Sequence, residues 1–263
     1  MKLIHITDFH LPSPGESLWG LDPFDRLGRC LDDIARWHGD AAFCVITGDM
    51  SDCGDPGAYD WLARRLEAFP LPTFMIPGNH DDREALKAAF PGLPQSEGGF
   101  IQFVQETEAG PFIFLDTCKG PVSEGRLCAQ RLDWLARALD DARGQDVRLF
   151  MHHPPFDVGI PYMDRIKLEN PDDFVQVISR HERIRHIFFG HVHRAAFVEW
   201  RGIPCTCLPG TSHQVPLQRE SIDGVPYSVE PPMYAVVEIS PSRTVVHFDA
   251  PLDRAPADVP PRR

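Results

Sequence analysis

The feature that most constrains the fold of this 263-residue chain is a pattern that occurs five times: a short apolar run ends at Asp, Asn or His. Apolar runs of this length, bounded by turn residues, predict buried strands. One such run, residues 73–76, leads through Pro77 into a Gly-Asn-His-Asp turn at residues 78–81. Open α/β sheets bind ligands beyond the carboxyl ends of their strands, so Asn79 and His80 stand where a ligand would lie. Taken singly, this segment would also suit an ordinary turn between a strand and a helix.

Four further apolar runs end in the same kind of side chain. They lead into Asp8 and His10, into Asp49, into His152 and His153, and into His191 and His193. Turn chemistry does not explain five strand ends that carry carboxylate, amide and imidazole groups, which are ligands that suit first-row divalent metals. In His-x-His on an extended segment both imidazoles face one side, and one carboxylate has two oxygens with which to bridge two cations. The pattern therefore predicts a metal site at the ends of the strands.

The rest of the chain reads as alternating strands and helices, followed by a β-rich end. Helices are predicted after the Asp-Pro pairs at residues 22–23 and 55–56, where Asp suits the N-cap and Pro the first helical position. Further elements are expected as follows: strands at 2–7, 41–47, 100–104, 111–116 and 147–151, helices at 84–90 and 127–142, and a loop at 159–170. The last β runs, 198–201, 203–208, 233–239 and 244–248, are expected to form the second sheet together.

Several polar residues near these strand ends have ordinary structural interpretations. Asp52 could support the metal ligands from behind or be a turn residue, and we favour the turn. Asp81 either caps the helix that follows it or orients His80. Adjacent histidines should point in different directions, so only one of His152 and His153 can be a ligand. Position in the motif favours His152, which leaves His153 a supporting or structural role. His181, Arg183, Arg185 and His186 are expected to flank an exposed helix end, without a catalytic part.

Composition bounds the kind of protein. An apolar content of 43% over this length predicts one domain spanning residues 1–263 with a proper core. The net charge of −12 argues against binding long nucleic acid, which needs basic patches. Seven cysteines, an odd number in a long chain, make a disulfide framework improbable. No signal peptide or long apolar span is recognisable, so we expect a cytoplasmic protein that does not contact a membrane.

The five blocks, D-x-H, G-D, G-N-H-D, H and G-H-x-H in that order, resemble the calcineurin-like metallophosphoesterase superfamily over roughly the first 210 residues. The resemblance implies an α/β fold, a four-layer α-β-β-α sandwich of two mixed β-sheets with a small β excursion near the C-terminus. That excursion, residues 209–232, could cap the site or form an oligomer contact, which allows a homo-oligomer.

The resemblance also implies a set of ligands for two divalent metal ions, such as Fe, Mn, Co or Zn. Asp8, His10 and His193 would hold one ion, Asn79, His152 and His191 the other, and Asp49 would bridge them. Such a pair of ions binds a water, lowers its pKa and aims the resulting hydroxide at phosphorus. His80 would be the acid at the leaving group. No serine or cysteine with an adjacent base suggests a protein nucleophile.

Details favour one branch of the superfamily. Protein phosphatases have Arg in the block where this chain has Cys53. Residues 150–155, 190–193 and 208–215 look like the cyclic-nucleotide and glycerophosphodiesterase branch, in which the histidine at His213 lies near the substrate. We therefore expect a phosphodiesterase acting on a small phosphodiester, glycerophosphodiesters first and 3′,5′-cyclic nucleotides second. A nuclease is disfavoured by the charge, and an inactive scaffold is disfavoured because none of the motif positions is missing.

Overall fold

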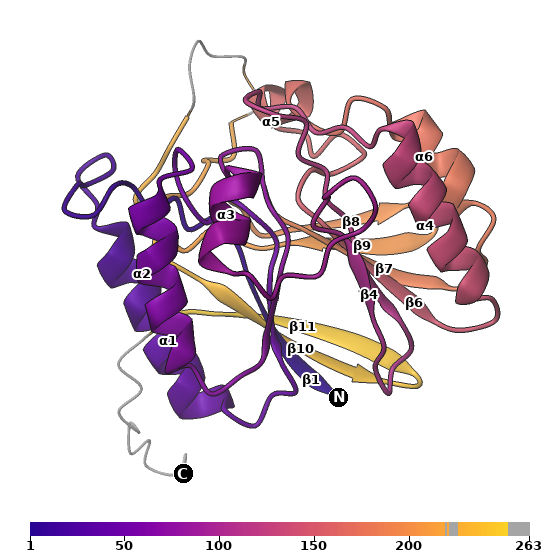
Figure 1. Cartoon of the computed structure of the whole chain (residues 1–263), viewed down its shortest axis with the longest axis horizontal. Helices are drawn as coiled ribbons and strands as arrows, with labels where there is room; N and C mark the ends of the chain where they lie inside the picture. The colour runs from indigo at the N-terminus through magenta and orange to yellow at the C-terminus, as the bar shows by residue number, and fades with distance from the viewer. Residues whose placement is uncertain (219, 221–225, 252–263) are drawn as a thin grey trace, which may run out of the picture.

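Two β-sheets packed face to face organise the protein in a computed structural model that describes residues 1–218, 220 and 226–251 (Figure 1). The first sheet has the strand order β11-β10-β1-β2-β3, and the second has the order β4-β5-β6-β7-β9-β8. Both sheets are mixed, because parallel central strands carry antiparallel strands at their edges. This arrangement confirms the predicted sandwich of two mixed sheets.

The strand bounds follow the apolar runs of the sequence. In the first sheet these are β1 (Lys2–Ile6), β2 (Cys44–Ile46), β3 (Thr73–Met75), β10 (Tyr234–Ser240) and β11 (Arg243–Asp249). In the second they are β4 (Phe103–Gln105), β5 (Phe112–Phe114), β6 (Val147–Met151), β7 (Ile184–Phe189), β8 (Ala196–Trp200) and β9 (Ile203–Cys207). Strands β1, β2 and β3 run parallel, as do β5, β6, β7 and β9, so their carboxyl ends meet at one edge of the sandwich.

Helices cover the outer face of each sheet. The helices α1 (Pro23–His38), α2 (Pro56–Glu67) and α3 (Arg83–Ala89) pack on the first sheet, and α4 (Ala129–Asp141), α5 (Pro161–Arg165) and α6 (Pro171–Ile178) pack on the second. Figure 1 shows α1–α3 on one side of the molecule and α4 and α6 on the other. As predicted, Asp22 and Asp55 cap α1 and α2, each accepting a hydrogen bond from a backbone amide three residues later.

A stack of aromatic rings fills the space between the sheets. The rings of Phe114 and Phe150 lie 4.8 Å apart, and those of Phe150 and Phe188 lie 4.9 Å apart, both pairs nearly parallel. Leu3, Val45 and Val237 of the first sheet meet this stack from the opposite side. Alternating side chains of each central strand thus serve either the inter-sheet core or the core beneath the helices, which fixes the register of both sheets.

The C-terminal runs do not form a sheet of their own, contrary to the expectation. Strands β8 and β9 extend the second sheet beyond β7, whereas β10 and β11 extend the first sheet by pairing β10 antiparallel to β1. Because β10 pairs with β1 on one side and β2 pairs with it on the other, the buried backbone of β1 has hydrogen-bonding partners on both sides. Which sheet a strand joins depends on contacts between residues far apart in sequence, and apolar patterning does not report them.

Two smaller expectations are also corrected. The segment 159–170 contains the short helix α5, and His186 is buried inside β7 rather than at a helix end, with its Nε2 2.7 Å from the Thr206 hydroxyl. The excursion at 209–232 is described only in part, because residues 219 and 221–225 lie outside the described residues. Its two arms meet at a bridge between Gln214 and Ser228.

All seven cysteines are free thiols. Across the part of the chain that the structure describes, no helix has the length and apolar character to cross a bilayer.

Candidate metal centre

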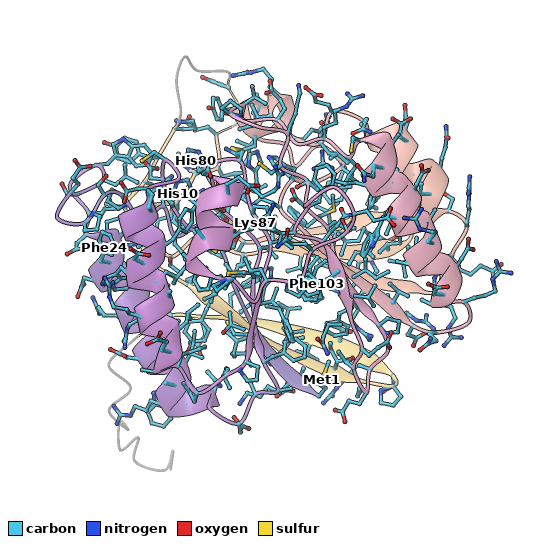
Figure 2. The ribbon with its side chains drawn as sticks, viewed as in Figure 1. Met1, His10, Phe24, His80, Lys87 and Phe103 are labelled. Carbon is cyan, nitrogen blue, oxygen red and sulfur yellow. The ribbon has the colours of Figure 1, made fainter. Side chains whose placement is uncertain are left out.

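The side chains at the five strand ends converge at the carboxyl edge of the two sheets, the region labelled by His10 and His80 in Figure 2. Five of these residues have a left-handed backbone that only glycine adopts readily. Their φ values are 56° at Asp8, 46° at His10, 51° at Asp49, 70° at His191 and 51° at His193. Sparsely populated conformations of this kind persist where the surrounding structure holds them, and they gather at functional sites.

One cluster consists of Asp8, His10, Asp49 and His193, whose ligand atoms all lie within 4.8 Å of one another. The Nε2 atoms of His10 and His193 are 3.0 Å apart, and an Asp8 oxygen is 3.3 Å from His193 Nε2. All four side chains are buried. Two carboxylates and two imidazole nitrogens aimed at one buried point form a donor set that suits a divalent cation.

A second cluster adjoins the first through Asp49. The Nε2 of His152 lies 3.2 Å from the Asn79 side-chain oxygen and 3.3 Å from Asp49 Oδ2. The same Oδ2 is 3.5 Å from His10 Nε2 in the first cluster, so one carboxylate oxygen reaches both. His191 Nε2 is buried and has no hydrogen-bond partner. A buried, unpaired ring nitrogen is costly, and a metal ion accepting its lone pair would remove that cost.

His153 also lies close to His152 and His191, yet it is a poorer ligand than Asn79. Its Nδ1 is 2.8 Å from the Thr117 hydroxyl, and its Nε2 is 3.2 Å from the Ser123 carbonyl. With both nitrogens engaged, neither is left for a metal. This geometry fits the structural role expected from the sequence.

Three of the histidines are oriented through their second ring nitrogen. His152 Nδ1 lies 2.6 Å from the Thr47 carbonyl, and His193 Nδ1 lies 2.9 Å from the His213 carbonyl. His10 Nδ1 lies 3.0 Å from an Asp52 carboxylate oxygen. Contacts of this kind fix the ring and its tautomer and leave Nε2 facing the site. Asp52 is therefore more than the turn residue that the sequence suggested.

Asp81 has neither of the roles expected for it. The cap of α3 is Asp82, which accepts a hydrogen bond from the Ala85 amide at 2.8 Å. The buried Asp81 carboxylate instead collects four donors: the amides of Gly78, Met50 and Ser51 and the Tyr59 hydroxyl, at 2.9–3.1 Å. Burial, together with the nearby Asp49 charge, raises the pKa of Asp81 to about 6. Asp81 thus joins the loops after β2 and β3 rather than orienting His80.

His80 stands at the rim of the clusters with its side chain 39% exposed. Its backbone amide donates to Asp49 at 2.9 Å, and its Nδ1 lies 2.7 Å from the Asp52 carbonyl. Burial disfavours the charged form of His80, but the Asp49 carboxylate and the Asp52 carbonyl outweigh burial and raise its pKa. A cavity of about 490 Å³ opens beside His80 and Asn79. A substrate group in this cavity would lie within reach of the clusters and of His80.

The cavity beside His80 is also lined by Arg83, which the sequence did not single out. The Arg83 guanidinium forms a two-pronged ion pair with Asp116, with distances of 2.8 and 2.9 Å. Arg131 reaches the Asp116 carbonyl at 2.7 Å from the buried side. Asp116 follows β5 in the same way as the metal-type residues follow their strands, but its partners are guanidinium groups.

His213 lies on the other side of the first cluster, with its ring 4.3 Å from that of His193 and 4.8 Å from that of His10. Its Nδ1 is buried and has no hydrogen-bond partner. Burial, followed by the neighbouring histidines, lowers the pKa of His213 and keeps its ring neutral. The expected substrate-side residue is therefore adjacent to the clusters.

Trp19, from the loop before α1, packs edge-on against His213 at 4.2 Å and stacks with Tyr227 at 4.6 Å. Sequence reasoning missed both aromatic residues, because each stands in an irregular segment without periodicity.

Two mixed sheets enclosed by helices, with Asp, Asn and His side chains gathered at the strand ends, define a metallophosphoesterase-type α/β protein. Residues 1–195 match the family described as calcineurin-like phosphoesterase, and the chain belongs to this family. Membership implies divalent metal ions, and the donor set described above fits them.

Similar proteins extend this comparison. The chain is 42% identical to a probable cyclic nucleotide phosphodiesterase of Rhodopseudomonas palustris, covering 96% of this chain and 95% of that protein. It is 32% identical to a glycerophosphodiester phosphodiesterase of Enterobacter lignolyticus, covering 88% and 84%. The crystal structure of a dimetal phosphatase from Danio rerio superposes with a TM-score of 0.70 at 17% identity, covering 95% and 96% of the two chains, which shows the shared fold.

Proposed function

We propose that this chain, a phosphodiesterase of the calcineurin-like family, uses two divalent metal ions to hydrolyse small phosphodiesters. One observation carries the proposal: Asp49 Oδ2 lies 3.5 Å from His10 and 3.3 Å from His152, so one carboxylate oxygen joins two donor clusters. Asp8, His10 and His193 would hold one ion with Asp49, and Asn79, His152 and His191 would hold the other. Fe, Mn, Co and Zn all suit these ligands.

Bound ions would supply a nucleophile at neutral pH and neutralise the phosphate charge. The chain's own side chains complete the reaction. His80 stands at the open rim, where the leaving group would lie, and a raised pKa favours the protonated form needed to donate a proton to the leaving oxygen. His213, held neutral against the first cluster, would contact the substrate without adding a competing positive charge.

A glycerophosphodiester is our first candidate substrate. The likeness to the Enterobacter glycerophosphodiester phosphodiesterase, together with the sequence blocks at 150–155 and 208–215, supports this choice. A diester of this kind is small and flexible, and a cavity of about 490 Å³ beside His80 has room for it.

A 3′,5′-cyclic nucleotide is the second candidate, and a specific observation favours it. Trp19 and Tyr227 are 41% and 47% exposed and form a stacked aromatic pair next to His213. Exposed aromatic side chains bind nucleobases by stacking, at about 1–3 kcal/mol per base. Such a pair has no partner in a purely aliphatic diester.

The experiment that tests the activity is hydrolysis of bis(p-nitrophenyl) phosphate by Mn²⁺-loaded protein. We expect turnover that disappears on chelation, returns with added Mn²⁺ and is lost in Asp49→Ala. A loaded protein that does not turn over this diester would instead support the scaffold alternative. Comparing kcat/KM for glycerophosphoethanolamine and cyclic AMP then ranks the two candidates. Trp19→Ala, with the exposed Trp37→Ala as control, should lower only the cyclic AMP value if stacking matters.

The remaining expectations about partners are proposals of the same standing. The acidic charge of the chain supports a small substrate over long nucleic acid, and a homo-oligomer and a cytoplasmic location are part of the same proposal.

A further inference from the structure

Among the residues that the structure describes, a buried arginine at the far end of the molecule forms no ion pair with an acidic side chain. Arg148 lies in β6 near the amino ends of the parallel strands, whereas the metal-type clusters lie beyond their carboxyl ends. Figure 2 shows Met1, which lines a cavity beside Arg148, well apart from His10 and His80. This region therefore plays no part in the candidate metal centre.

The Arg148 side chain is only 4% exposed, and its guanidinium is incompletely satisfied. One nitrogen donates to the Ala109 carbonyl at 2.7 Å, while the buried Nε has no hydrogen-bond partner. The Phe112 ring, 5.7 Å from the guanidinium carbon, gives a weak cation–π contact. Within residues 1–218, 220 and 226–251, no carboxylate forms an ion pair with Arg148. Because a buried cation is costly without a counter-charge, the site calls for an anion.

The nearest carboxylate is already engaged. Asp146 accepts hydrogen bonds from Arg183 Nε at 2.7 Å and from Arg185 Nε at 2.9 Å, both at the same oxygen. These two guanidinium groups keep the pKa of Asp146 below its usual value, although burial acts in the opposite direction. Asp146 is therefore paired with two other arginines and forms no ion pair with Arg148.

Cavities of about 520 Å³ lie on both sides of Arg148. The cavity between the edge strands β8 and β11 is lined by Arg148, Arg185 and Arg243 against the single acid Asp146, which gives a lining charge of +2 (three cations minus one anion) in a chain whose net charge is −12. The lining also includes the hydroxyl-bearing residues Thr206, Ser240, Ser242 and Thr244. Two exposed rings, Phe197 at 69% and Phe248 at 38%, form its outer wall.

We propose that this cavity, the Arg148 site, binds a phosphomonoester dianion that carries an aromatic group, such as a nucleoside monophosphate. The dianion matches the lining charge, and planar guanidinium groups bind phosphate oxygens in pairs. Phe197 and Phe248 stack with the aromatic group at the mouth. The site is separate from the metal centre, so the proposal does not depend on the proposed hydrolysis.

The test is isothermal titration of the metal-loaded full-length chain with 5′-AMP. The wild type is expected to bind two equivalents, one at the metal centre and one at the Arg148 site. Arg148→Met, which keeps the side-chain length but removes the charge, should bind one equivalent and retain wild-type turnover of bis(p-nitrophenyl) phosphate. Arg137→Met removes an exposed arginine on α4 and should bind two, as the matched control.

Arg243→Met tests the same site without touching a buried residue. Because Arg243 is an exposed residue at the start of β11, the variant should fold and bind the second 5′-AMP about 10- to 100-fold more weakly. Ribose 5-phosphate should bind this site more weakly than 5′-AMP, since it has no ring to stack. Equal stoichiometry and affinity for 5′-AMP in the wild type, Arg148→Met and Arg243→Met would overturn the proposal, whether or not the metal centre also binds 5′-AMP. Equal affinity for the two ligands would overturn the aromatic part.

Discussion

Asp52 shows how much of a metal-type site depends on residues that touch no metal. Its carboxylate holds His10 Nδ1 at 3.0 Å, and its carbonyl holds His80 Nδ1 at 2.7 Å. One residue thereby orients a proposed ligand and the proposed acid. The two functions divide between side chain and backbone, so substitution of the side chain separates them.

We predict that Asp52→Asn lowers metal affinity without abolishing the fold. Loss of a carboxylate behind a ligating histidine typically costs 10- to 100-fold in metal affinity. The measurement is metal binding by competition with a chelator, with the exposed Asp60→Asn as control. Unchanged affinity in Asp52→Asn would show that the contact with His10 is incidental.

For His80 we predict an effect on turnover but not on metal content. His80→Ala should bind metal as the wild type does, because the ring is not among the proposed ligands. Turnover of an alkyl diester, whose alkoxide is a poor leaving group, should fall by about 10²–10⁴-fold. Turnover of a p-nitrophenyl ester should fall less, because its leaving group needs less protonation. The check is kcat on both substrates at saturating metal, and equal alkyl diester rates in wild type and variant would rule out the role.

At the scale of single residues, the sequence indicates the proposed ligands better than the residues that orient them. Asp8, Asn79 and His193 are recognisable because they stand in an ordered set of motifs, and the structure brings them together with the others. For Asp52 the less favoured of two expected roles fits the structure, and for Asp81 neither does, since a polar residue in a turn looks the same whether it caps a helix or reaches across to another loop. Only the three-dimensional partners distinguish these cases.

Among the elements, the loops after β2 and β3 are joined by one carboxylate. Asp81 accepts from three backbone amides and the Tyr59 hydroxyl, so it fixes the positions of Asp49 and Asn79 relative to each other. The neighbouring Asp82 merely caps α3. The two adjacent aspartates are therefore expected to contribute very differently to the stability of the protein.

We predict that Asp81→Ala destabilises the protein by at least about 3 kcal/mol, because each buried donor left without a partner costs about 1–3 kcal/mol. Asp82→Ala should cost only about 1 kcal/mol, the usual value of an N-cap. Urea unfolding of chelator-treated protein measures both without interference from bound metal. Equal losses in the two variants would contradict this ranking.

Local signals also explain which elements were foreseen. The Asp-Pro starts of α1 and α2 are set by neighbouring residues, and both were predicted. The separation of β8 and β9 from β10 and β11 was not, because strand partners are chosen by packing across long sequence distances. The short helix α5 lacks the length to show a helical period.

Over the whole molecule, the proposed ligands come from both sheets. Asp8, Asp49 and Asn79 follow strands of the first sheet, whereas His152 and His191 follow β6 and β7 of the second. Each proposed ion would therefore connect the two halves of the sandwich. Ligands that bind only the folded chain stabilise it in proportion to RT ln(1 + [L]/Kd).

We predict that metal loading raises the free energy of unfolding by about 3–4 kcal/mol at metal concentrations of 100 to 1,000 times Kd. Differential scanning calorimetry with Mn²⁺ and after chelation gives the shift in Tm. Asp49→Ala should show a much smaller shift, because it removes the carboxylate shared by both clusters. If the Tm of the wild type is the same with Mn²⁺ and after chelation, a metal centre held between the sheets is contradicted.

The five left-handed residues at the strand ends carry a consequence for how the protein matures. Sparsely populated backbone conformations persist where surrounding contacts hold them, and here the amides of Asp8 and His10 donate to the carbonyls of Gly48 and Asp49 in the neighbouring loop, at 3.0 and 2.9 Å. A newly synthesised chain should accordingly complete its folding with the cradle for the ions already shaped. Binding of the ions then requires only that they diffuse to the site and lose hydration water. We therefore expect any suitable divalent ion that is abundant in the compartment to occupy the site.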